Sequence, residues 1–318
     1  NYRIDSLNDI DNATIHVLRH TSYHRRLEEL IEEGIPLKLR LYDSISTEEM
    51  LRRVAAKEIQ LTVADSHIAL LNRRYYPDIK IAFPVSENQS LGWAVRKGDE
   101  QLLGKINEFF DTIRESGRFG KIYEKYYADV EIFDYVDLKK FHIRVDTRLP
   151  RYINMIKKES DKYGFDWRLI AAVIYQESHL DPRARSYTGV RGLMQVTRLT
   201  AQEMGISNRL DPRQSIQAGV KYLAKMYKRF PEIENPRERM LFALASYNIG
   251  YGHVRDAQRI ARRKGLNPQK WSSMEKTLPL LRSPRYYRKT KHGYARGTEP
   301  VRYVDRIVMY YDILRQKI

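Results

Sequence analysis

The hydrophobic pattern changes once along this chain, and that change limits the folds open to it. Over residues 14–127, short runs rich in β-branched residues alternate with amphipathic stretches. The apolar runs lie at 15–18, 37–41 and 61–64, and the amphipathic ones at 23–33 and 47–57. This βαβαβ order predicts a parallel sheet covered by helices. Two further strands, at 79–83 and 92–95, and a long helix over 99–127 are also predicted.

After Pro150 the pattern predicts only helices. Asp166 is placed to cap a helix over 167–178, and residues 200–203 have the sequence of a capping box. At Asp211-Pro212 and Asn235-Pro236 a cap precedes a first-turn proline. The stretch 134–150 has no clear period. We therefore predict an α+β two-domain chain, with an α/β domain over 1–135, a linker over 136–150 and an all-α domain over 151–318.

Composition narrows the class of protein. The chain has 318 residues, 42% of them hydrophobic and 31% charged, which suits a folded chain of about two domains. Its longest strongly apolar stretch, 169–175, is far shorter than the roughly 20 residues that span a bilayer. With no cysteine, disulfide scaffolds, thiol catalysis and cysteine-ligated zinc are excluded.

The charge is strongly basic and unevenly distributed. Residues 251–318 contain 17 basic and 5 acidic side chains, so +12 of the net charge of +17 lies in the last 68 residues. Such an excess indicates a polyanionic partner: nucleic acid, an anionic membrane surface or an acidic cell-wall polymer. A solubilising surface without a partner remains the alternative.

One carboxylate of the second domain combines an apolar setting with helical spacing. On the predicted helix 167–178, Glu177 lies three positions after Ile174 and four after Val173, which belong to the apolar face. Burial raises a carboxyl pKa towards the value that a general acid needs near neutral pH. Taken alone, the pattern also suits a structural glutamate with its hydrogen bonds satisfied.

Three later segments carry residues typical of a sugar-binding cleft. They are Gly189-Val190-Arg191-Gly192-Leu193-Met194-Gln195, Ala245-Ser246-Tyr247-Asn248-Ile249-Gly250 and Arg302-Tyr303-Val304-Asp305. Aromatic faces stack on pyranose rings, and amides bond N-acetyl and hydroxyl groups. Glycines let the backbone approach a ligand closely.

Together with Glu177-Ser178, and in this order, these segments resemble the goose-type lysozyme-like catalytic domain of bacterial lytic transglycosylases. The resemblance covers essentially all of 151–318. It implies that Glu177 is the catalytic acid and base. It also implies a set of substrate-binding residues: Ser178, with Met194 and Gln195 shaping glycan subsites, Tyr247 and Asn248 orienting Glu177 and the N-acetyl group, and Tyr303 closing the cleft. Ser246 departs from the family, which often has alanine there.

The number of carboxylates separates two mechanisms. Ordinary glycosidases use a pair, but residues 182–202 contain no acidic side chain, and Asp181 reads as a turn residue. A lone carboxylate suits assistance by the acetamido group of the substrate. The resemblance then implies that Glu177 protonates the leaving oxygen and afterwards accepts the proton of the muramyl 6-hydroxyl. The product is a 1,6-anhydro sugar, formed without water, cofactor or metal.

The first domain resembles the second lobe of a type-two periplasmic solute-binding protein, on residues 18–23, 63–66 and 91–99. In amino-acid-binding relatives the positions of Thr21 and Ser22 receive a ligand carboxylate, and that of Asp65 an ammonium group. Helix capping by Thr21 and Ser22, and a strand end at Asp65, is the alternative. In the whole architecture a signal sequence and a first lobe precede this one, so we expect half of any ligand cleft here.

A binding-protein-like lobe before a lysozyme-like catalytic domain is the arrangement of one family of membrane-bound lytic transglycosylases. That resemblance implies peptidoglycan as substrate, a muropeptide or amino-acid effector, and a periplasmic location at the outer membrane with peripheral attachment. Two other classes stay open: a protein that grips glycan without cutting it, and a nucleic-acid-binding protein. No helix-turn-helix, RNA-recognition or zinc signature supports nucleic acid.

Overall fold

The computed structural model describes residues 6, 9–10, 13–87, 89–123, 135–186 and 189–318. The chain divides into two compact units, residues 1–140 and 141–318. Within the described ranges no helix combines the length and the hydropathy that a membrane crossing requires.

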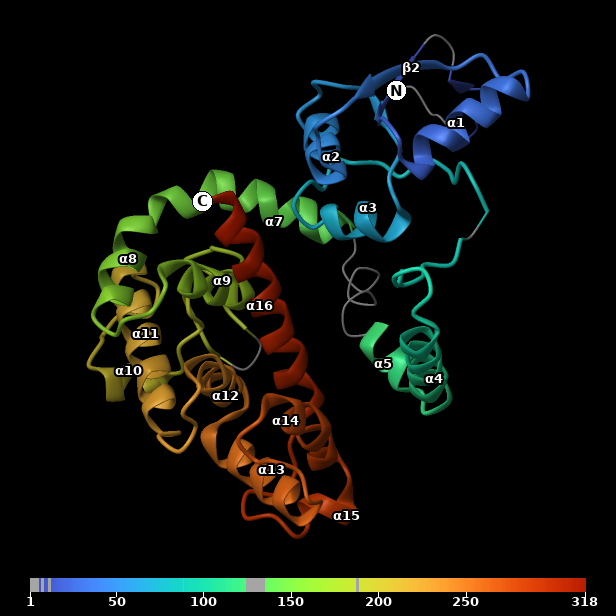
Figure 1. The fold of residues 1–318 in the computed structure, drawn as a ribbon. Helices are drawn as coiled ribbons and strands as arrows, with labels where there is room; N and C mark the ends of the chain where they lie inside the picture. Colours follow the sequence, from blue (N-terminus) through green and yellow to red (C-terminus); the bar gives the residue numbers. More distant parts are fainter. Residues whose placement is uncertain (1–5, 7–8, 11–12, 88, 124–134, 187–188) are drawn as a thin grey trace. The chain divides into compact units, whose positions relative to one another are not determined.

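The first unit is built on the predicted parallel sheet. Strand β1 (Thr14–Leu18) lies between β2 (Lys38–Tyr42) and β3 (Leu61–Thr62), and both pairs are parallel. Helix α1 (Ser22–Glu32) follows β1, α2 (Thr47–Ala55) follows β2, and α3 (Ser66–Asn72) follows β3 (Figure 1). Leu27 and Leu30 of α1 pack with Ile15 and Val17 of β1, since alternate strand residues share a face.

Two parts of the secondary-structure prediction for this unit are wrong. No strand forms at 79–83 or 92–95 in the described chain. Leu91 and Trp93 are instead 80% and 66% exposed, because a β-prone run becomes a strand only where a neighbouring strand pairs with it. The helix predicted over 99–127 is two helices, α4 (Glu100–Glu115) and α5 (Arg118–Tyr123), since Gly117 has a positive φ of 64°. Residues 124–127 lie outside the described part.

The segment predicted as a linker is mostly helical. Helix α7 (Tyr135–Arg148) and a 3₁₀ turn, η3 (Leu149–Arg151), occupy it, and the boundary between the two units falls inside α7. Pro150 lies within η3, where its missing N–H is tolerated. The sequence analysis did not predict this helix.

The second unit is helical, as predicted, apart from isolated bridges that join Arg191 to Arg185 and Val196. Its helices are α8 (Ile153–Asp161), α9 (Trp167–Ser178), α10 (Arg198–Met204), α11 (Pro212–Lys228), α12 (Pro236–Ile249), α13 (Tyr251–Arg263), α14 (Trp271–Thr277), α15 (Pro284–Tyr287) and α16 (Thr298–Lys317), with a 3₁₀ turn η4 (Pro279–Arg282). Helix α9 packs against α8 and α16, and α12 packs against α11, α13 and α16 (Figure 1). From Ile170 to Tyr175 every side chain of α9 is at most 3% exposed, which makes α9 the central helix of this unit.

Most helix starts of this unit are confirmed. The side chains of Asp166, Asp211 and Asn235 accept backbone N–H groups at the starts of α9, α11 and α12. The capping box predicted at 200–203 is wrong, because α10 already begins at Arg198. Its N-cap is Thr197, whose hydroxyl accepts the N–H of Thr200.

Candidate active site

Glu177 lies in the last turn of α9 and is partly buried. Tyr303 of α16 donates its hydroxyl to Glu177 Oε1 over 2.5 Å. Burial raises the pKa of Glu177 from an ordinary 4.5 to about 7, and the Tyr303 hydrogen bond holds it from rising further. Near neutral pH, both the protonated and the ionised carboxyl are therefore populated, as a group that first gives and then takes a proton requires.

The loop after α9 folds back on itself beside this residue. Gln195 has a positive φ of 46°, and its amide donates to the carbonyl oxygens of Gly192 (2.8 Å) and Ala184 (3.1 Å). Within the described chain its side-chain oxygen has no protein partner, so it is free to accept a hydrogen bond from a ligand. This arrangement suits the predicted role of Gln195 at a glycan subsite.

Gly192 acts differently from the sequence-based interpretation. A Cβ added at Gly192 would lie 1.9 Å from the carbonyl oxygen of Arg209, and φ is 85°. This glycine therefore allows a close approach to protein backbone rather than to a ligand. Gly189 has a similar φ of 84° but open space around it.

Met194 contacts the site residue Tyr247 through its backbone. It is fully buried, against Gly219 of α11, where an added Cβ would lie 2.3 Å from its sulfur. Its carbonyl oxygen accepts the hydroxyl of Tyr247 over 2.7 Å, and its N–H donates to Ser215 over 3.2 Å. Met194 thus has no exposed surface for contact with a sugar.

Tyr247 lies in the last turn of α12, near Glu177. Burial, then the Glu177 carboxylate and Tyr222, raise the pKa of Tyr247 well above 10. Burial and Glu177 act on the pKa of Tyr303 in the same direction. The structure therefore brings Glu177, Tyr247 and Tyr303 together from α9, α12 and α16, with Tyr303 rather than Tyr247 bonded to the carboxyl.

The remaining candidates of this unit are placed less directly. Ser178 is buried, and its hydroxyl donates to the helical carbonyl of Ile174 over 3.0 Å. Asn248 is exposed next to Tyr247. Asp181 accepts the N–H of Arg183 over 2.9 Å, in the turn that the sequence predicted for it.

Two neighbours of the site were missed by sequence reasoning. Tyr222 of α11 meets the ring of Tyr247 edge-on, with centroids 5.4 Å apart. Arg209 donates to the carbonyls of Gly189 (3.0 Å) and Val196 (3.1 Å) and so fastens the loop. Neither belongs to a recognisable motif, and an aromatic face of α11 would have been the only signal for Tyr222.

In the first unit the structure brings the three predicted regulatory residues to neighbouring loops. Thr21 caps α1, and Ser22 is the first residue of that helix and exposed. Asp65 precedes α3 and accepts the hydroxyl of Tyr23 over 2.7 Å. This bond joins the first turn of α1 to the loop after β3, at the sheet edge where doubly wound sheets bind ligands.

In the part of the chain that the structure describes, no three His, Asp or Glu side chains lie close enough together to hold a metal ion.

Sequence comparison matches this chain to known proteins. The profile of the transglycosylase SLT domain matches residues 154–269. The membrane-bound lytic murein transglycosylase F of Desulfosudis oleivorans is 60% identical over 304 residues, which are 96% of this chain and 67% of that protein. The protein of the same name from Photobacterium profundum is 42% identical over 303 residues, 95% of this chain and 59% of that protein.

Among solved structures, the match to the 70 kDa soluble lytic transglycosylase of Escherichia coli covers 93% of this chain and 45% of the Escherichia coli chain. The two are 17% identical, with a TM-score of 0.42. The assignment of this chain comes from the sequence relatives, of which it spans about two thirds or less. Identity of 60% over nearly its whole length means that this chain belongs to the membrane-bound lytic murein transglycosylase F family.

Proposed function

We propose that this chain is a peptidoglycan lytic transglycosylase, which cleaves the β-1,4 bond between N-acetylmuramic acid and N-acetylglucosamine and forms a 1,6-anhydromuramoyl end. The observation that carries this proposal is the setting of Glu177, a carboxyl at the end of α9 that accepts the hydroxyl of Tyr303 and whose pKa is raised by burial to about 7. Residues 182–202, which follow α9, contain no acidic side chain. We therefore assign the acid and the base steps to the same residue.

The first step uses the protonated form of Glu177. Tyr303 donates to Oε1, so the acidic proton is carried by the other carboxyl oxygen, Oε2. That proton passes to the glycosidic oxygen as its bond to the anomeric carbon breaks. The acetamido oxygen of the same muramyl residue attacks the anomeric carbon and takes up the positive charge.

In the second step Glu177 acts as a carboxylate. It accepts the proton of the muramyl 6-hydroxyl, and that oxygen attacks the anomeric carbon and displaces the acetamido oxygen. Glu177 regains its proton, so no water is consumed and the reaction is a lyase reaction. The free side-chain oxygen of Gln195 is available to accept a hydrogen bond from the bound sugar.

Digestion of purified sacculi tests this function. Borohydride reduces ordinary reducing ends but leaves anhydro ends unchanged, so mass spectrometry of reduced products separates the two. We expect anhydro ends from the wild type and no release by Glu177→Gln. Glu234→Gln, an exposed carboxylate of the same unit, is the matched control and should remain active. A majority of reducible ends would assign the chain to the hydrolases.

We further propose that the first unit is a solute-binding-protein-like regulatory lobe, which takes a charged amino acid or the peptide of a muropeptide at Thr21, Ser22 and Asp65. The Tyr23–Asp65 bond supports a common site for the loops after β1 and β3. A ligand can regulate only by binding two states of the chain unequally. With half of the cleft, we expect weak or no binding. In a protein that joins this unit to the first lobe of the architecture, calorimetry should find muropeptide binding that Asp65→Ala weakens and that Asp111→Ala, at an exposed carboxylate of α4, does not. Equal affinity in all three proteins would remove Asp65 from the site.

The location follows from the substrate class. Peptidoglycan lies in the periplasm, and the relatives are named membrane-bound. We propose a periplasmic enzyme attached peripherally to the outer membrane. Fractionation of cells that produce the whole protein should place it with outer-membrane fractions, from which high salt or mild detergent should release it.

A further inference from the structure

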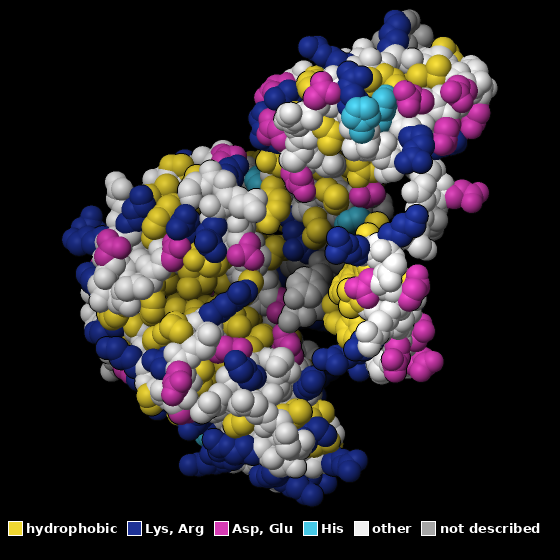
Figure 2. All heavy atoms as spheres, viewed as in Figure 1, with side chains coloured by type: hydrophobic (Ala, Val, Ile, Leu, Met, Phe, Trp, Pro, Cys, Tyr) yellow, Lys and Arg dark blue, Asp and Glu magenta, His cyan; other side chains and the backbone are white. Residues whose placement is uncertain are grey.

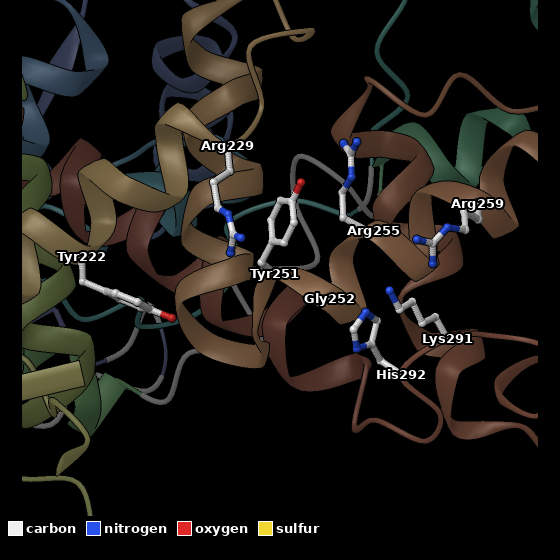
Figure 3. A pocket seen from close by; sticks show the side chains of 8 residues that line it. All are labelled: Tyr222, Arg229, Tyr251, Gly252, Arg255, Arg259, Lys291 and His292. Atoms are coloured by element: carbon white, nitrogen blue, oxygen red, sulfur yellow. The ribbon is translucent and has the colours of Figure 1, made fainter. Parts of the chain in front are cut away.

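A cavity of about 510 Å³ in the helical unit has a lining that is almost entirely basic and aromatic (Figure 3). Its cations come from three segments. Arg229 follows the last residue of α11, Arg255 and Arg259 lie on α13, and Lys291 lies in the loop before α16. Within the described chain, none of the residues that line it is acidic.

The wall of this cavity is organised by a buried carboxylate behind it. Asp256 is 0% exposed, pairs with Arg259, and accepts the backbone N–H groups of Lys291 (3.2 Å) and His292 (2.8 Å). A Cβ at Gly252 would lie 2.6 Å from the His292 ring, so this glycine lets the loop pack onto α13. Asp256 thus holds the Arg259 side chain and the backbone of the loop that carries Lys291.

Two of the cations keep their charge uncompensated. Arg255 pairs with Glu232, and Arg259 with Asp256. Arg229 lies over the ring of Tyr251, 4.1 Å from its centroid, which holds the guanidinium without neutralising it. No carboxylate in the described ranges lies within ion-pair distance of Arg229 or Lys291.

The cavity adjoins the candidate active site. Tyr222, at one end of the view in Figure 3, lines it, and the ring of Tyr222 meets that of Tyr247. Tyr247 is close enough to Glu177 for that carboxylate to raise its pKa. A glycan strand at Glu177 therefore lies within reach of the cationic wall.

The surface around it is also basic. Figure 2 shows Lys and Arg side chains gathered on the end of the helical unit that carries α13 and α15. Both helices belong to the last 68 residues, which together hold +12 of the net charge. A concave basic wall raises the local concentration of anionic ligands.

We infer that this cavity binds a free carboxylate of the stem peptide on the glycan strand being cut. The inference rests on the proposed function and adds a peptide subsite to it. The planar guanidinium of Arg229 can bind a carboxylate through two N–H groups, and Lys291 adds a second positive charge to the lining of the same cavity. A concave site next to Glu177 fits a peptide that hangs from the strand better than it fits a flat membrane surface.

The test compares two double variants. Arg229→Gln/Lys291→Gln removes the two unpaired cations of the cavity. The control, Lys228→Gln/Lys289→Gln, changes two exposed lysines that lie nearby in the chain but do not line the cavity. Both pairs remove two positive charges from the same segments. The substrates are glycan strands with stem peptides and the same strands freed of peptide by an amidase. We expect kcat/KM on peptide-bearing strands to fall roughly tenfold in the first variant only, with peptide-free strands cleaved at wild-type rates. Circular dichroism checks folding, and Lys291→Gln alone, on an exposed side chain, is the milder variant.

Three other patterns of kcat/KM overturn the inference. Unchanged rates, equal losses on both substrates, or equal losses in the control would show that the cavity does not read the peptide. If the wild type cuts neither substrate, the proposed function fails, and calorimetry with the two kinds of strand still decides whether the cavity binds peptide. If vesicles of anionic phospholipid bind the wild type but not Arg229→Gln/Lys291→Gln while strand affinity is equal, the site belongs to a membrane.

Discussion

Replacing Glu177 by glutamine should remove activity and, at neutral pH, stabilise the fold. Glutamine keeps the shape of the side chain and can still accept the Tyr303 hydroxyl, but it cannot give up and recover a proton. It also carries no charge that burial would penalise. The two effects have one cause, the desolvation of this carboxyl.

The size of the stabilisation follows from the pKa. The folded value is about 7 and the ordinary value is 4.5. Between these pH values the native state keeps a proton that the unfolded chain has lost, so the stability of the wild type falls as pH rises. At 1.36 kcal/mol per pKa unit the loss reaches about 3 kcal/mol above pH 7. Because Glu177 is only partly buried, we expect about 1.5–3 kcal/mol.

Urea denaturation of both proteins from pH 4 to pH 8 measures this difference. The free energy of unfolding of Glu177→Gln relative to wild type should rise between pH 4.5 and pH 7 and level off above. Glu234→Gln, an exposed change of the same kind, should give a flat difference. A flat difference for Glu177→Gln too would refute the desolvation argument, and muropeptide release by the folded variant would refute its catalytic role.

Three further changes test other parts of the site. Tyr303→Phe removes the hydrogen bond that lowers the pKa of Glu177, so the alkaline limb of the pH–rate profile should move up by about one pH unit. The Tyr247 hydroxyl is bonded to Met194 instead, so Tyr247→Phe should leave that limb in place. Gly192→Ala should destabilise the fold by more than about 2 kcal/mol in urea, and clearly more than Gly189→Ala, since both have positive φ but only Gly192 meets the Arg209 carbonyl. Ser246→Ala should raise the melting temperature, with a gain of about 1 kcal/mol in stability, because the Ser246 hydroxyl is buried and has no hydrogen-bond partner among the described residues. An unchanged or lower melting temperature would mean that this hydroxyl is satisfied.

Local signals in the sequence predicted local structure well. Helix caps form at Asp166, Asp211 and Asn235 because the oxygen of a short side chain can reach a backbone N–H two or three residues later. Such a contact depends only on residues that are close in the sequence. Thr197 and Thr200 show the limit of such signals. Both are suitable caps three residues apart, and the start of α10 depends on how the preceding loop folds.

Contacts between distant residues could not be read from spacing. Glu177 was expected on a buried face from periodicity, but its bond to Tyr303 joins residues 126 positions apart, and only the family resemblance placed Tyr303 at the site. The role of Gly192 depends on the backbone of Arg209, and the cationic cavity draws on α11, α13 and the loop before α16. The basic excess was visible in composition, whereas its concave arrangement needed the fold.

The position of Glu177 in the last turn of α9 bears on why one carboxyl can serve two steps. Burial raises its pKa, and the carbonyl groups at a helix C-terminus also disfavour a negative charge there. A glutamate at the start of a helix would be held ionised instead. The Tyr303 hydroxyl opposes burial and keeps the pKa near 7, where giving and taking a proton are similarly favourable. Because this balance depends on how far Glu177 is withdrawn from water, the packing of α9 against α8 and α16 is part of the chemistry. Loosening that packing should lower the pKa of Glu177 and the rate together.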